Sequence, residues 1–212
     1  MEKINLESSP EINLSEEERG NVEKIEGLPL VDFDKVDIML ILKNLKQATY
    51  VKIYSDRKKD FEQSLKDLGL VGLLGKKEKL PNSKKTAQEF YIARTEDVAK
   101  RIETALQTFN DAELGVLSGY PPSAIENFEK IKKLTGSEKE VYESLKGLLI
   151  EVSELPEDIR QEDYLSFVNF RLSRDNFRQE LEVVRGWAEE IKRLDPALFK
   201  RVVDWYRNLN SR

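Results

Sequence analysis

The apolar and polar positions between residues 34 and 110 switch between the period of a strand and that of a helix. The segment 49–54 alternates, with Val51 and Ile53 on one side, and this β-branched and aromatic alternation predicts a strand. The same criteria predict two further strands at 70–74 and 88–94, and helices at 34–46, 61–68 and 96–109. We therefore expect an α+β unit, a small three-stranded sheet with covering helices on one face.

Beyond residue 110 only helical spacing recurs. Ser137 and Glu140 have the spacing of a capping box, and a long apolar stripe follows at 177–191. Asp195 and Pro196 predict the start of a last helix, whose buried stripe is expected at Leu198, Val202, Trp205 and Leu209. A C-terminal helical bundle is predicted, and the chain divides into a tail (1–33), the α+β unit (34–110) and a bundle packed on it (111–212).

Charge is unevenly distributed along the chain. Residues 1–37 hold eleven acidic and four basic side chains, and residues 38–85 hold five acidic and twelve basic ones. The first stretch has only scattered aliphatic residues, so the tail is expected to be mostly disordered. One hypothesis is that this acidic tail masks the basic surface and competes with an anionic partner.

Composition excludes several kinds of chemistry. The 212-residue chain has no cysteine and no histidine, which rules out disulfides, thiolate or histidine metal sites and the usual catalytic triads. Cofactors are not expected. No basic region followed by an apolar run opens the sequence, and no apolar run is long enough to span a membrane, so a cytoplasmic location is expected.

The segment 111–128, DAELGVLSGYPPSAIENF, predicts a corner between two helices. Tyr120 is followed by two prolines, which end one helix and suit the first turn of the next, where Ser123 and Glu126 have capping-box spacing. The segment is interpreted as a structural hinge or binding elbow, with Tyr120, Glu113 and Glu126 as candidate binding residues. An alternative is a magnesium-dependent enzyme acting on a phosphate ester through Asp111, Glu113 and Glu126.

The same segment resembles the signature of a group of functionally uncharacterised prokaryotic proteins. In that group, Leu-Gly-Tyr-Pro is followed by one or two cysteines and then by a phenylalanine. The residues that carry the resemblance are Leu117, Gly119, Tyr120, Pro121, Ile125 and Phe128. Ser123 and Ala124 stand at the cysteine positions, so the resemblance implies a related fold and no thiol or metal chemistry.

Asp32 and Asp34 have the spacing of the aspartate loop in haloacid-dehalogenase-type phosphatases. Pro29 interrupts the strand that such a loop requires, and the glycine and threonine expected after the second aspartate are missing. We instead interpret Asp34 as the N-terminal cap of the helix predicted at 34–46.

A cluster of lysines lies in the connection predicted at 75–86. Its candidate anion-binding residues are Lys76, Lys77, Lys84 and Lys85, near Tyr50 and Tyr54 on the exposed face of the first strand. A nucleic-acid-binding protein is therefore a further alternative, although the pI near 5.2 argues against it. The leading prediction is a non-enzymatic intracellular binding or regulatory protein, with a protein as its expected partner.

Overall fold

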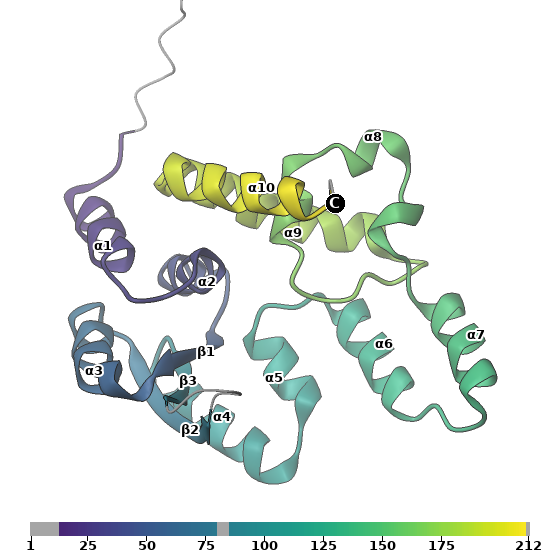
Figure 1. Cartoon of the computed structure of the whole chain (residues 1–212), viewed down its shortest axis with the longest axis horizontal. Coiled ribbons are helices and arrows are strands. Elements are labelled where there is room, and N and C mark those ends of the chain that lie inside the picture. Colours follow the sequence, from purple (N-terminus) through teal and green to yellow (C-terminus); the bar gives the residue numbers. More distant parts are fainter. Residues whose placement is uncertain (1–12, 80–84, 211–212) are drawn as a thin grey trace, which may run out of the picture.

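A computed structural model describes residues 13–79 and 85–210 (Figure 1). Its sheet contains β1 (Ala48–Tyr54), β2 (Val71–Lys79) and β3 (Thr86–Ala93), all antiparallel, in the order β1-β3-β2. Val51 of β1 and Leu74 of β2 both lie opposite Phe90, which is in the central strand. The predicted α+β class and the small three-stranded sheet are confirmed.

Helices cover the two faces of the sheet unequally. On one face, α2 (Asp32–Leu42) and α3 (Lys58–Asp67) bury the apolar side chains of the strands, and the Phe61 and Phe90 rings meet at 5.2 Å. On the other face, α4 (Glu96–Thr108) covers one end, where Val98 and Ile102 pack on Ala93. The expectation of a single covered face was thus incomplete, because the apolar stripe of α4 also packs against the sheet.

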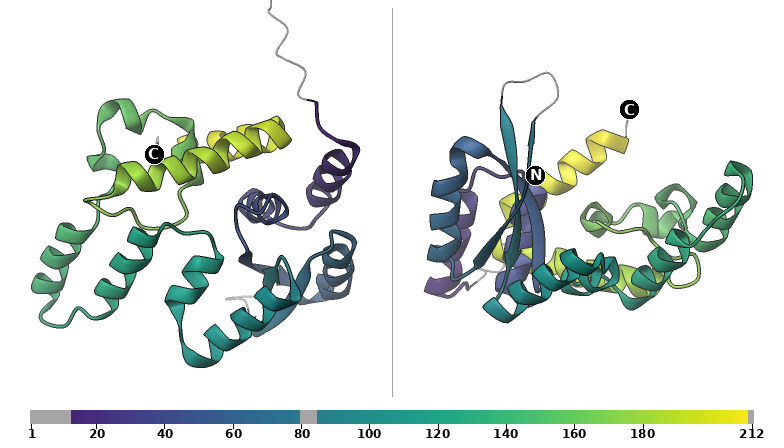
Figure 2. Two further views of the ribbon diagram at one scale, coloured as in Figure 1. Left: turned by 180° about the vertical axis from the view of Figure 1, so that it is seen from behind. Right: turned by 90° about the horizontal axis from the view of Figure 1, so that it is seen from below.

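The rest of the chain is helical and spreads away from the sheet (Figure 2). These segments are α5 (Asp111–Leu117), α6 (Pro122–Lys132), α7 (Glu138–Leu148), η2 (Val152–Glu154), α8 (Glu157–Arg160), η3 (Asp163–Phe167), α9 (Phe177–Leu194) and α10 (Pro196–Asn210), whereas η1 (Ser55–Arg57) joins β1 to α3 and contacts β3. Helices α9 and α10 pack together, and α2 contacts β1, α9 and α10. Ile38 of α2, Ile191 of α9 and Leu198 of α10 belong to one core, which joins the sheet to the helical half. In the described part of the chain, no helix is long and apolar enough to cross a membrane.

The predicted disorder of the tail is wrong for residues 16–26, which form helix α1 (Glu16–Glu26). Ser15 and Glu18 close a capping box at its start, and Ile25 is buried in the main core. Glu18 also accepts hydrogen bonds from Lys43 at 2.8 Å and Arg193 at 2.6 Å. The acidic residues therefore cap and anchor a helix. Residues 1–12 of the predicted tail lie outside the described residues.

Several predicted helix ends are confirmed. The Thr95 side chain accepts from the Val98 N–H, Ser137 and Glu140 form a capping box, and Asp195 accepts from the Leu198 N–H at 2.9 Å. Pro196 is the first residue of α10. At α4, α7 and α10 the local capping sequence therefore marks where the helix begins.

Other local predictions are wrong. Helix α2 starts two residues before Asp34, with Val31 as its cap, so Asp34 lies inside the first turn. No capping box forms at Ser123, because Pro121 is the N-cap and the Ser123 hydroxyl donates to Glu180 at 2.6 Å. Strand β2 extends to Lys79, into the predicted loop, because it pairs with β3 beyond a register shift.

The predicted stripe of α10 is only half buried. Leu198 and Val202 are fully buried, whereas Trp205 and Leu209 are 54% and 55% exposed. Trp205 instead lies across the ring of Phe33, with 5.0 Å between centroids. The far end of α10 extends past the core, so helical spacing there does not imply burial.

Candidate functional site

The corner between α5 and α6 is fixed by backbone geometry. Gly119 adopts a φ of 75°, and the Tyr120 N–H donates to the Gly115 carbonyl at 3.0 Å, which closes α5. A Cβ on Gly115 would lie 3.1 Å from the Ile125 side chain, so glycine allows the two helices to approach closely. Pro122 then occupies the first position of α6. The two glycines and the proline together form the predicted elbow.

A cavity of about 450 Å³ lies at this elbow. Most of its wall is apolar, with α5, α6, the end of α7 and residues 170–171 all contributing. The main apolar lining residues are Leu114, Ile125, Phe128, Ile131, Leu149 and Phe170. Small-molecule sites in proteins usually have this size and a mostly apolar wall with few polar groups. The elbow therefore encloses a cavity of the size and polarity of a small-molecule site.

Long-range hydrogen bonds hold the wall segments in place. The Asn127 amide donates to the Leu148 carbonyl at 3.1 Å, which ties α6 to the end of α7. The Ser123 hydroxyl reaches Glu180 of α9, and Glu180 is fully buried and also accepts from the Ser173 N–H at 2.7 Å. Because these bonds connect four separate segments, the cavity wall is fixed by the tertiary structure.

Tyr120 lines the elbow cavity, and its ring lies 5.5 Å from that of Phe170. Burial, together with the nearby Asp37 carboxylate, raises the pKa of Tyr120 to about 12. The phenol therefore stays protonated at neutral pH and can donate a hydrogen bond, but it is not a base. Of the binding residues predicted at the corner, Tyr120, Glu113 and Glu126, Tyr120 is the one that lines the cavity.

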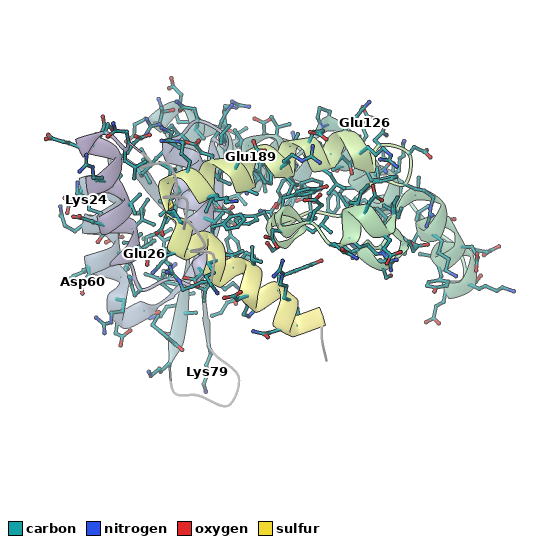
Figure 3. All side chains as sticks on the ribbon, turned by 90° about the horizontal axis from the view of Figure 1, so that it is seen from above. Lys24, Glu26, Asp60, Lys79, Glu126 and Glu189 are labelled. Carbon is teal, nitrogen blue, oxygen red and sulfur yellow. The ribbon has the colours of Figure 1, made fainter. Side chains whose placement is uncertain are left out.

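The other predicted elbow residues lie elsewhere. Glu113 accepts from Arg101 at 2.7 Å, which ties α5 to α4, and Glu126 is exposed on the outer surface (Figure 3). Asp111 lines the cavity but pairs with Lys132 at 2.8 Å. These carboxylates form no cluster for a cation, and residues 13–79 and 85–210 contain no group of three acidic side chains that could hold a metal.

Arg171 is an exposed residue of the cavity wall. Unlike Asp111, it has no hydrogen-bond or ion-pair partner among the described residues. A guanidinium has a rigid set of donors that suits carboxylates and phosphates. The elbow cavity thus combines an apolar wall with one uncompensated positive charge. Sequence reasoning did not select Arg171, because nothing local to its sequence indicates a cavity.

A buried ion pair lies on the other side of Tyr120. Lys46 is only 2% exposed. Its ammonium donates to Asp37 at 2.5 Å and lies 4.4 Å from the centre of the Trp187 ring. Asp37 also accepts from the Thr49 hydroxyl at 2.7 Å. Lys46 and Thr49 follow Asp37 by nine and twelve residues, whereas Trp187 comes from α9, so spacing along the sequence could not predict the contact with its ring. One local signal was Asp37 itself, a charge directly before the apolar residues 38–42 of α2.

The lysine cluster is remote from the elbow. Lys76 and Lys77 are exposed on β2, and Lys79 lies at the projecting end of the hairpin, far from Glu126 (Figure 3). The Lys85 ammonium lies 4.9 Å from the centre of the Tyr54 ring, and the predicted Lys84 lies outside the described residues.

No protein-family model matches the chain, and no curated protein or solved structure matches it either.

Proposed function

We propose that this chain is a binding protein whose elbow cavity takes up a small amphipathic anion, a molecule with an apolar body and a carboxylate or similar head group. The single observation that carries the proposal is the cavity of about 450 Å³ with its largely apolar wall. Burial of a hydrocarbon chain in such a wall contributes roughly 0.8 kcal/mol for each methylene group. That contribution is sufficient to bind a medium-length chain without covalent chemistry.

The charge of the ligand follows from the lining. Asp111 is neutralised by Lys132, whereas Arg171 has no partner within the described residues. An anionic head group would pair with the guanidinium, and a charge-assisted hydrogen bond of this kind is worth roughly 1.5–3 kcal/mol when partly shielded from water. An amphipathic cation could not form this pair with Arg171. The proposal therefore predicts selectivity by charge as well as by hydrophobic length.

The test is calorimetric titration of the purified chain with decanoate, decan-1-ol and decyltrimethylammonium below their aggregation concentrations. We expect saturable binding at one site, with decanoate the tightest of the three. Arg171→Gln should weaken decanoate about tenfold or more and leave decanol unchanged. Arg178→Gln is the matched control, because Arg178 is an exposed arginine outside the cavity whose guanidinium lies 5.4 Å from the centre of the Phe177 ring.

A second variant tests the cavity itself. Ile131→Trp adds bulk to the wall at the end of α6 and should abolish binding of decanoate and decanol together, while an unchanged unfolding midpoint shows that the fold is kept. Equal binding of all three compounds, or binding unaffected by Ile131→Trp, would contradict the proposal. A protein partner, as the sequence predicted, would instead give complex formation that Ile131→Trp blocks without any response to decanoate.

A further inference from the structure

A second cavity, of about 370 Å³, lies beside the elbow and shares Ser118 and Tyr120 with it. Its lining comes from α2, β1, η3 and α9. Two carboxylates of α2, Asp34 and Asp37, lie three residues apart on the same side of the helix and both line this cavity. The rest of the wall is rich in aromatic rings, supplied by Phe33, Tyr50, Tyr120, Phe167 and Trp187.

The two carboxylates differ in their partners. Asp37 is satisfied, because one oxygen accepts from Lys46 and the other from Thr49. Asp34 is partly buried and has neither a hydrogen bond nor an ion pair within the described part of the chain. Since Lys46 and Asp37 cancel, the cavity keeps one uncompensated negative charge. That charge lies in a wall rich in aromatic rings, whose faces attract cations.

We propose that this cavity binds a small organic ammonium ion, with Asp34 as its counter-ion and the aromatic rings around its alkyl groups. Lys46 is an internal precedent, because its ammonium already pairs with a carboxylate of α2 while lying over the Trp187 ring. A hard divalent metal is a poorer fit, because such ions need several oxygen ligands and only Asp34 offers a free carboxylate. The volume suits a short alkylamine.

Calorimetric titration with n-hexylammonium chloride at constant ionic strength tests this inference, with n-hexanol and potassium chloride as comparisons. The ammonium ion should bind saturably and more tightly than hexanol, and potassium chloride should give no saturable binding. Asp34→Asn should weaken the ammonium about tenfold or more. Asp32→Asn is the matched control in the same turn of α2, because Asp32 pairs with Arg201 at 3.1 Å and does not line the cavity.

Acidity gives an independent readout. Burial, with a contribution from Asp37, raises the pKa of Asp34 to about 6, so ammonium affinity should fall about tenfold from about pH 7.5 to about pH 5. The other titratable groups facing this cavity are Asp37 of α2, Tyr50 of β1 and Tyr120 after α5, with Lys46 behind Asp37. If Asp34 is the counter-ion, Asp34→Asn abolishes the pH dependence and the other groups contribute little.

The outcomes separate this site from the elbow site. Arg171→Gln should leave ammonium binding unchanged, and Asp34→Asn should leave decanoate binding unchanged. Absence of saturable ammonium binding, unchanged affinity in Asp34→Asn, or equally strong binding of hexanol would each overturn the inference. Competition by magnesium at equal ionic strength would indicate a metal site and would overturn it as well.

Discussion

Gly119 should tolerate no side chain, and the structure allows the cost to be worked out. At its φ of 75°, an alanine pays roughly 1–2 kcal/mol of backbone strain. Its Cβ would also lie 2.9 Å from the Leu45 carbonyl oxygen and 3.1 Å from Cγ of Lys46, which costs roughly 1–3 kcal/mol of overpacking. The loss of chain entropy in the unfolded state offsets about 0.4–1 kcal/mol. The middle values of these three ranges sum to almost 3 kcal/mol, so Gly119→Ala should destabilise the fold by about 2–3 kcal/mol.

The assay is thermal and urea unfolding of Gly119→Ala beside Gly186→Ala. Gly186 is exposed within α9, and a Cβ added there would meet no atom within 4 Å outside its own helix backbone. The same substitution at Gly186 should therefore stabilise the fold by about 0.5–1 kcal/mol. For a chain of this size, Gly119→Ala should lower the melting temperature by roughly 4–12 °C. Gly119→Asn relieves the strain but keeps the steric contact, so it should fall between the two. Equal shifts in Gly119→Ala and Gly186→Ala would refute this reasoning.

Substitutions at three further positions are tested by unfolding. Because the folded pKa of Asp34, about 6, exceeds its ordinary value of 3.8, the fold loses stability as pH rises from about 4 to 6. After allowance for solvent screening, Asp34→Asn should gain about 1–2 kcal/mol at neutral pH and nothing at pH near 4. Glu180→Ala leaves donors from Ser173 and Ser123 unpaired in the core and should cost about 3–5 kcal/mol, whereas Glu180→Gln should cost clearly less. Phe109 is 84% exposed at a φ of 53°, so Phe109→Gly should stabilise by about 1 kcal/mol.

Local sequence signals predicted the elements that form locally. Alternation identified β1 and β3, and the capping residues Thr95, Ser137 and Asp195 marked true helix starts. Helix α1 was missed because its high charge was interpreted as disorder, although Ser15 and Glu18 had the capping-box spacing that was used successfully at Ser137.

The candidate site was predictable only in part. Backbone chemistry at Gly119 and Pro122 predicted the elbow, and Tyr120 does line its cavity. Glu113, selected by proximity in sequence, turns toward Arg101 instead. Arg171 enters the wall from a segment distant in sequence, through tertiary contacts that no spacing rule encodes.

Uptake of a small amphipathic anion by the elbow cavity is tested by methyl NMR spectroscopy of the isotope-labelled chain titrated with decanoate. We expect saturable shifts of the Ile125 and Ile131 methyl resonances, because both residues line the elbow cavity. The methyl groups of Ile38 and Ile41, buried in the main core and outside that cavity, should stay unchanged. No saturable shift at Ile125 and Ile131, or shifts spread equally over all four isoleucines, would contradict it.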